Sequence, residues 1–288
     1  MPTVVADPQT RVMEIVKKVT NIATLPQVTA KIIATVEDPR STAAQLHQIV
    51  SHDPALVTRI LKVVNSAFYG LPGQIGSIER AIVLLGLNAV KNIAVAASIG
   101  QLFRGGKLCE GFSARDLWTH CIAVAVVARD LAKQMKLPIA DEAFLAGMIH
   151  DVGILIQLQT DPEKLRETCE AAKTSSSSFC ELETQIIGID HQLLGAALAD
   201  QWKFPHSCQL VAGYHHNPKQ LNQQSRTLVS LVHVADIIAC KSKHGFNLTA
   251  CHENYTPEDF APLGLDDAAV ARTTARLDEL VSVAQNVL

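Results

Sequence analysis

The chain has 288 residues, of which 48% are hydrophobic, 18% are charged and only 5% are aromatic, and its formal net charge is −3. This length and apolar content are sufficient for one large core or for two smaller lobes. This negative net charge argues against a general nucleic-acid binder, because proteins of that class are usually basic.

Seven cysteines are spread along the chain without a C-x-x-C pair, so we expect reduced thiols rather than disulfides or a thiolate zinc site. The N-terminus shows no basic region followed by an apolar stretch, so no signal peptide is expected. Apolar runs such as 122–128 are far shorter than the roughly 20 residues that span a bilayer. The sequence therefore predicts a soluble, cytoplasmic protein with no membrane partner.

The N-terminal third predicts a series of short helices separated by capping and turn residues. An Asp-Pro pair places the proline at the first position of a helix, where its missing N–H costs nothing. The signals, in chain order, are a helix end at Asp38-Pro39, a cap at Ser41 or Thr42 before Leu46, Ile49 and Val50, a cap at Asp53-Pro54 before Leu56, Ile60, Val63 and Val64, a turn at 69–73, a cap at Ser77, a stop at Gly86, and a last helix from Asn88 to about Ser98.

The rest of the chain also predicts helices, and no segment alternates as a strand would. Expected helices begin near Asp116 and Pro162 and at Ser178, which forms a capping box with Glu181, and others cover 144–158, 192–202, 208–214, 226–239 and 268–287. The glycine-containing segment 104–113 is the best candidate for a linker. We therefore predict an all-α protein with two helical lobes, 1–105 and 111–288.

Several polar residues lie on apolar helix faces, where an unpaired charge is costly. His120 shares a face with Val124, Val127 and Leu131, and Asp116 lies one turn before it. His150-Asp151 interrupts a segment that is otherwise apolar nearly all round. His191, His215-His216 and Asp236 occupy comparable positions on later helices. A single core histidine is more often hydrogen-bonded than metal-bound, so only the complete set favours a metal site.

The order of motifs resembles the HDOD domain, the "HD-related output domain" of bacterial signalling proteins, over roughly 22–218. The matching segments are Thr24-Leu25-Pro26, 36–39, His52-Asp53-Pro54-Ala55-Leu56, Val64-Asn65-Ser66-Ala67-Phe68-Tyr69-Gly70, 77–82, Leu85-Gly86-Leu87, Leu117-Trp118-Thr119-His120, 146–153, 191–195 and Gly213-Tyr214-His215-His216. This resemblance implies a helical fold related to the HD-domain phosphohydrolases, preceded by a helical N-terminal lobe. It also implies a regulatory role with a signalling protein as partner.

The polar residues, in chain order, resemble the metal-ligand set of the HD-domain phosphohydrolases, and in particular that of the HD-GYP phosphodiesterases. The ligands that this likeness implies are Asp116, His120, His150, Asp151, His191, His215, His216 and Asp236. Histidine with carboxylate suits one or two transition-metal ions, with iron as the first choice and manganese, nickel or zinc as alternatives. Asp151 could bridge two ions, which would make it the catalytic residue in a hydrolase.

The chain departs from the HD-GYP enzymes at two positions. Those enzymes carry Gly-Lys one residue after the His-Asp pair, whereas this chain has Gly153-Ile154, so the lysine that would meet a phosphate is missing. After the paired histidines the chain continues with Asn217-Pro218-Lys219 in place of the acidic residue and the Gly-Tyr-Pro loop. Both departures argue against a cyclic di-nucleotide phosphodiesterase.

Two functions remain open, and a third is disfavoured. We prefer a regulatory protein that retains its metal. The alternative is a metal-dependent phosphohydrolase or phosphodiesterase with a nucleotide or phosphate ligand. The segment 42–65 has the spacing of a helix–turn–helix, but its second helix offers only Thr58, Arg59 and Lys62 to DNA, and we expect no nucleic-acid partner.

Overall fold

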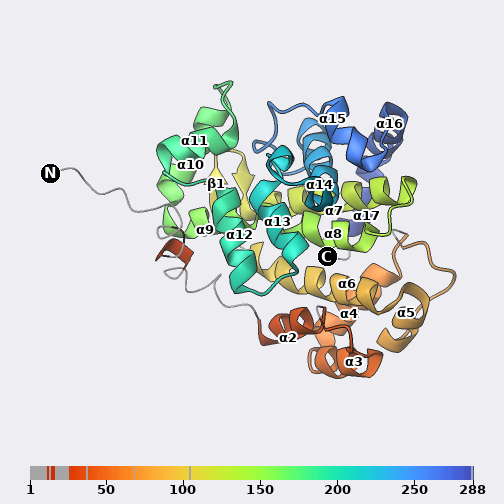
Figure 1. Cartoon of the computed structure of the whole chain (residues 1–288). Helices are drawn as coiled ribbons and strands as arrows, with labels where there is room; N and C mark the ends of the chain where they lie inside the picture. Colours follow the sequence, from red (N-terminus) through yellow and green to blue (C-terminus); the bar gives the residue numbers. More distant parts are fainter. Residues whose placement is uncertain are drawn as a thin grey trace.

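The structure is a computed structural model that describes residues 12, 14–16, 26–36, 38–67, 69–103, 105–286 and 288. It is mostly helical, with one two-stranded sheet (Figure 1). The N-terminal helices are α2 (Gln27–Val36), α3 (Ala43–Ser51), α4 (Pro54–Val64), α5 (Ile78–Leu85) and α6 (Leu87–Ile99), followed by the 3-10 turn η1 (Gly100–Phe103). The prediction of an all-α fold is confirmed.

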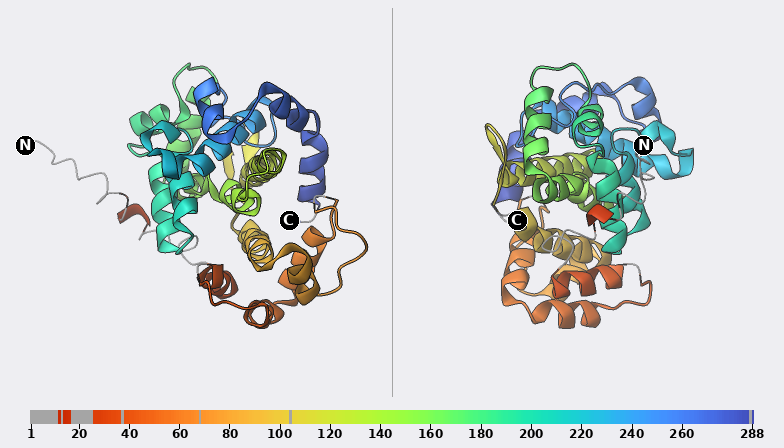
Figure 2. Two further views of the ribbon diagram at one scale, coloured as in Figure 1. Left: turned by 45° about the vertical axis from the view of Figure 1, so that its right-hand side comes forward. Right: turned by 90° about the vertical axis from the view of Figure 1, so that its left-hand side faces the viewer.

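The C-terminal helices surround α7, which is the longest helix of the described chain and lies near the centre of the molecule (Figure 2). They are α7 (Ala114–Gln134), α8 (Ala140–Ile149), α9 (Val152–Thr160), α10 (Pro162–Ala172), α11 (Phe179–Ile186), α12 (His191–Gln201), α13 (His206–Tyr214), α14 (Gln223–Lys241), α15 (Pro257–Phe260), α16 (Asp267–Ala275) and α17 (Leu277–Gln285), with 3-10 turns η2 (Pro218–Gln220) and η3 (Ala261–Leu263).

A single hydrophobic core connects the two groups of helices. Helix α7 packs against α8, α14, α16 and α17, and α6 joins the N-terminal helices to this bundle through α8. Every residue from 120 to 129 on α7 is buried, so this helix is surrounded by protein on all sides over that stretch. The division into two lobes remains a prediction, since the main core cluster extends from α2 to α17 without a break.

The helix starts follow the capping residues of the sequence. Thr42 forms a capping box with Gln45, Asp53 accepts a hydrogen bond from the backbone N–H of Leu56, and Ser77 caps α5. Ser178 forms the predicted capping box with Glu181 at the start of α11. Side chains of this kind satisfy the free N–H groups of the first helical turn, so short polar residues fix where each helix begins.

Two segments differ from the sequence prediction. The stretch read as a linker contains a hairpin, in which β1 (Lys107–Cys109) pairs antiparallel with β2 (Phe112–Ser113) around Gly111, which has φ +85°. The hairpin buries Leu108 and Cys109, and its first strand packs on α10. The predicted helix 144–158 is two helices, α8 and α9, separated at His150-Asp151.

One stretch, Ala140–Thr160, is long and apolar enough to cross a membrane by length and composition alone. In the folded chain, however, 83% of its most apolar window is buried, and the His150-Asp151 pair interrupts it. It therefore forms part of the protein core. Three residues named in the sequence interpretation, Thr24, Leu25 and Phe68, lie outside the described residues, as do positions 37, 104 and 287 of the ranges quoted there.

Candidate metal centre

Six helices bring the polar core residues to one place. His120 comes from α7, the His150-Asp151 pair from the break between α8 and α9, and His191 from the first position of α12. His215-His216 follow the end of α13, and Asp236 lies on α14. All seven are buried, and the most accessible of them, His216, is only 9% exposed.

One carboxylate oxygen of Asp151 faces a first group of residues. Asp151 Oδ2 lies 3.5 Å from His120 Nε2 and 3.4 Å from His150 Nε2. Asp236 Oδ1 lies 3.0 Å from His120 Nε2 and 3.9 Å from His150 Nε2. The imidazoles of His120 and His150 thus lie near two carboxylates, that of Asp151 and that of Asp236.

The other carboxylate oxygen faces a second group. Asp151 Oδ1 lies 3.3 Å from the Nε2 atoms of both His191 and His215. His216 Nε2 lies 3.2 Å from His191 Nε2. The ligand atoms of Asp151, His191, His215 and His216 all lie within 4.8 Å of one another, which is the spacing of donors around a single cation.

The outer nitrogens of three histidines are held by groups that can only accept a hydrogen bond. His150 Nδ1 donates to the carbonyl of Gly147 at 2.8 Å, and His215 Nδ1 donates to that of Val211 at 3.0 Å. His191 Nδ1 donates to Glu183 at 2.7 Å. These contacts place the proton of each neutral ring on Nδ1, so each Nε2 directs a lone pair toward the cluster.

When both rings are neutral, the lone pairs of His191 and His215 face each other without a proton between them and repel. The Nε2 atoms of His120 and His150 are 3.3 Å apart, and so are those of His191 and His215. Both oxygens of Asp151 and the Oδ2 of Asp236 are buried without a hydrogen bond of acceptable geometry. A cation among these atoms would satisfy all of them together, so the donor set fits a transition metal bound by histidine and carboxylate.

The protonation states of Asp151, His215 and His216 suit the same conclusion, because a metal ligand must be free of its proton. Burial, together with the charge of neighbouring histidines, lowers the pKa of His215 and of His216 to about 3. Burial alone would raise the pKa of Asp151, but His150, His191 and His215 outweigh it and hold that pKa well below its usual range.

Three further residues support the cluster without having been predicted from the sequence. Glu183 on α11 accepts hydrogen bonds from both the backbone N–H and Nδ1 of His191. Glu253, in the loop after α14, lies 2.9 Å from His216 Nδ1. Burial raises the pKa of Glu253 to about 7, and the charge of Asp236 adds to this. Cys240 donates to Asp236 Oδ1, and burial keeps its thiol protonated by raising its pKa.

Of the two glutamates, only Glu183 left a signal in the sequence. Glu183 follows Phe179 and Leu182 on the buried face of α11, so a carboxylate at an apolar position could have been noticed. Glu253 lies in an irregular loop, where no periodicity predicts which side chains turn inward.

The structure corrects the prediction for Asp116. Its Oδ2 accepts hydrogen bonds from the backbone N–H of Ser113 at 2.7 Å and from the Ser113 hydroxyl at 2.6 Å, which forms a capping box at the start of α7. No group of candidate ligand atoms among the described residues includes it. Asp116 shares a helix face with His120, but it lies in the first turn, where its carboxylate satisfies free N–H groups instead.

The histidines that matched no ligand position have other roles. His47 pairs with Glu79 at 2.8 Å on the surface, and His52 and His206 are exposed. His233 is buried and donates from Nδ1 to the carbonyl of His215 at 2.7 Å. It therefore holds the backbone of a cluster residue rather than adding a donor to the cluster.

The position of the missing lysine is closed. Ile154 is fully buried in α9. Beside it, Gly153 packs so closely on α12 that a Cβ would lie 1.9 Å from the carbonyl oxygen of His191. No residue of the cluster lines any of the five best-formed cavities in the described part of the chain.

Comparison with known proteins assigns the chain to a family. The model of the HDOD domain matches residues 22–218. The chain belongs to the HDOD family. A curated relative from Treponema pallidum, described only as an uncharacterized protein, is 26% identical over 225 residues, which are 77% of this chain and 43% of the relative. The chain therefore spans less than half the length of that protein.

Solved structures share the fold at low identity. An HDOD domain protein of unknown function from Geobacter sulfurreducens has a TM-score of 0.81 and 22% identity, and 98% of each chain is covered. A candidate phosphohydrolase from Shewanella amazonensis SB2B has a TM-score of 0.73 and 24% identity, with 96% of this chain and 97% of that chain covered. A candidate signal transduction protein from Marinobacter aquaeolei VT8 has a TM-score of 0.74 and 23% identity, with 98% of this chain and 66% of that chain covered.

Proposed function

We propose that this HDOD protein is a cytoplasmic regulatory module that acts through a signalling partner and holds a dinuclear metal site in its C-terminal helices. The observation that supports two ions is the position of Asp151, whose two oxygens face two separate groups of histidines. The first subsite would consist of His120, His150, Asp151 and Asp236, and the second of Asp151, His191, His215 and His216. Iron is the first choice for both, with manganese, nickel or zinc as alternatives.

The burial of the cluster favours regulation over turnover. A substrate must reach the metal, but the members of the cluster are between 0% and 9% exposed. The loop that follows α14 also approaches from outside, with Glu253 against His216. The position of the missing lysine is taken by Ile154, which is fully buried. In this interpretation the metal fixes the relative positions of the six helices that carry or adjoin its ligands.

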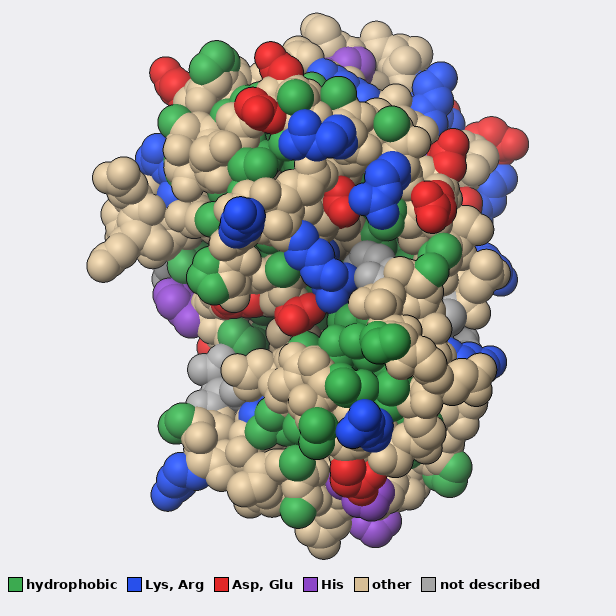
Figure 3. Space-filling view, turned by 90° about the vertical axis from the view of Figure 1, so that its right-hand side faces the viewer, with side chains coloured by type: hydrophobic (Ala, Val, Ile, Leu, Met, Phe, Trp, Pro, Cys, Tyr) green, Lys and Arg blue, Asp and Glu red, His purple; other side chains and the backbone are tan. Residues whose placement is uncertain are grey.

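The N-terminal helices offer a surface for the partner. Val83 and Leu84 on α5 are 73% and 38% exposed, and they are two of the three large hydrophobic side chains that are exposed in the described chain. Figure 3 shows the side of the molecule that is on the right in Figure 1, and apolar side chains gather over its lower half, where the N-terminal helices lie. Adjacent exposed apolar side chains of this kind are typical of protein–protein contacts.

The alternative is a metal-dependent phosphohydrolase or phosphodiesterase acting on a nucleotide. The bridging position of Asp151 favours it, because two metal ions joined by a carboxylate can supply a hydroxide nucleophile near neutral pH. In that case Asp151 would be the catalytic residue, and opening of the loop around Glu253 would have to expose the site.

A turnover measurement separates the two functions. The purified protein, loaded in turn with iron, manganese, nickel and zinc, would be incubated with nucleoside mono- and triphosphates and cyclic di-nucleotides, and phosphate or nucleotide release would be followed. Regulation predicts no release above that of an Asp151→Ala control. Metal-dependent release that disappears in Asp151→Ala would establish the hydrolase instead.

A further inference from the structure

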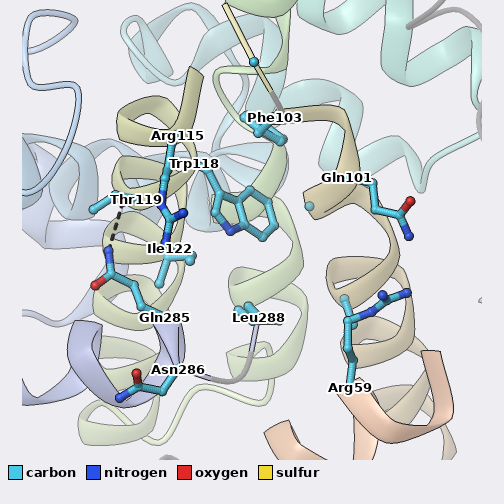
Figure 4. Close-up of a pocket in the computed structure, with 13 residues that line it drawn as sticks. Arg59, Gln101, Phe103, Arg115, Trp118, Thr119, Ile122, Gln285, Asn286 and Leu288 are labelled. Atoms are coloured by element: carbon cyan, nitrogen blue, oxygen red, sulfur yellow. Dashed lines mark hydrogen bonds between the residues drawn. The ribbon is translucent and has the colours of Figure 1, made fainter. Parts of the chain in front are cut away.

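A cavity of about 700 Å³ lies between the two groups of helices and apart from the metal cluster. Helices α4 and α6 line one side of it, and α7 and the end of α17 line the other (Figure 4). This volume falls in the range of small-molecule sites, which is roughly 300–1,000 Å³. None of the cluster residues lines it.

Among the described residues, the charged side chains that line this cavity are two arginines. Arg59 comes from α4 and Arg115 from α7, and no acidic side chain is among the described residues that line the cavity. Within the described chain neither arginine forms an ion pair or a side-chain hydrogen bond, and the Nε of Arg59 is buried without a partner. A buried guanidinium N–H without an acceptor is costly, and the phosphates of a bound ligand would supply acceptors for the free guanidinium groups of the lining.

An aromatic ring occupies the space between them. The indole of Trp118 packs on Phe103, with ring centroids 4.8 Å apart, and against Gly100, where an added Cβ would lie 2.8 Å from the ring. Figure 4 shows the indole between Arg115 on one side and Gln101 and Arg59 on the other. A fixed indole that faces a cavity offers a stacking surface for a planar ring.

Uncharged amides complete the lining. The side chains of Gln101 and Asn286 make no hydrogen bond within the described chain, and each amide can both donate and accept, as the edge of a base requires. Gln285 is engaged differently, since its Nε2 donates to Thr119 Oγ1 at 2.9 Å and fastens α17 to α7.

We propose that this cavity binds a nucleoside phosphate. The base lies against Trp118, within reach of the free amides, and the phosphates extend to the arginines that line the cavity. Such a ligand joins the N-terminal helices to α7, the helix that also carries His120. The proposal does not depend on the metal cluster, because no cluster residue contributes to the cavity.

Titration of the protein with ATP, GTP and inorganic pyrophosphate tests this proposal. The chain has two tryptophans, and Trp202 is only 5% exposed, so a change in intrinsic fluorescence reports mainly on Trp118. Binding would be confirmed by calorimetry. We expect saturable binding of ATP or GTP, with pyrophosphate at least tenfold weaker.

Three variants assign the binding to this cavity. Arg59→Gln and Arg115→Gln should each weaken nucleotide binding by about tenfold or more, since each removes a charge-assisted hydrogen bond. Arg115 is exposed, so its variant should keep the wild-type melting temperature. Arg80→Gln is the matched control, because Arg80 is an exposed arginine on α5 that does not line the cavity.

The outcomes that would overturn the proposal are distinct. Absence of saturable ATP or GTP binding at millimolar concentration would do so, as would unchanged affinity in both cavity variants. Pyrophosphate binding as tight as that of the nucleotides would show that the base is not recognised. The titration would be repeated after chelation of metal, and loss of binding there would assign the nucleotide to the metal cluster instead.

Discussion

The contact between α9 and α12 provides the sharpest single prediction. Gly153, two residues after Asp151, faces the first turn of α12, and an alanine Cβ there would lie 1.9 Å from His191 O and 2.8 Å from Gly195 N. Ordinary contacts of a Cβ begin at 3.4 Å, so α12 would have to move by about 1.5 Å in Gly153→Ala. The obstacle is backbone, which cannot rotate away as a side chain can.

The expected cost can be worked from two opposing effects. Overpacking of a core costs about 1–3 kcal/mol, and the backbone obstacle at Gly153 places it near the upper end. Alanine is favoured over glycine inside a helix by about 1 kcal/mol. We therefore expect Gly153→Ala to lower the free energy of unfolding by about 2 kcal/mol, measured by urea denaturation after chelation of metal.

The same displacement should also lower the metal content. His191 is the first residue of α12, and its Nε2 lies 3.3 Å from Asp151 Oδ1, so a shift of this helix would separate two donors of the proposed site. The matched control is Gly76→Ala, since a Cβ at Gly76 meets no atom within 4 Å. If Gly153→Ala were as stable as Gly76→Ala and kept its metal, the close contact between these helices would not matter for the site.

The other predictions concern the cluster itself. Glu183→Gln should weaken metal binding by about 10–100-fold, because Glu183 orients His191 and increases the donor strength of its ring. Competition with a chelator measures the metal affinity, and an unchanged affinity would argue against this role of Glu183. Asp116→Ala should lower the free energy of unfolding by about 1 kcal/mol, because it removes a helix cap, and it should leave the metal content unchanged. A loss of metal in this variant would mean that Asp116 is a metal ligand after all. Although burial opposes it, nearby carboxylates raise the pKa of His150 and of His191, so the metal-free protein holds protons there that metal must displace. Metal affinity, measured between pH 6 and 8, should therefore fall as the pH is lowered, and a pH-independent affinity would contradict this. Removal of metal with a chelator should lower the melting temperature, since binding to the folded state alone stabilises it; an identical melting curve would mean that the ion does not hold the helices together.

Much of the fold was predictable from local chemistry. Thr42, Asp53, Ser77 and Ser178 each cap the helix that the sequence assigns to them, because a cap depends on residues three positions apart. The break between α8 and α9 was not predictable in this way. His150-Asp151 turns inward because partners on α7, α12, α13 and α14 meet there, and that is a property of the whole fold.

The candidate site shows the same limit. Helical periodicity correctly predicts that His120 and Asp236 face the core. It also places Asp116 on the same face as His120, but the carboxylate of Asp116 forms the N-terminal capping box of the helix instead. Periodicity says nothing of Glu253, which reaches His216 from an irregular loop. The hairpin around Gly111 was missed because strands of three and two residues are too short to show alternation.

The central claim is that the buried cluster holds transition metal, and elemental analysis tests it most directly. The protein would be purified without a histidine tag and measured beside Asp151→Ala, with Asp116→Ala as the matched carboxylate control. We predict about one or two equivalents of metal in the wild type and in Asp116→Ala, and a clear loss in Asp151→Ala. A wild-type protein that is folded and free of metal would contradict the claim and leave the cluster as a purely structural feature.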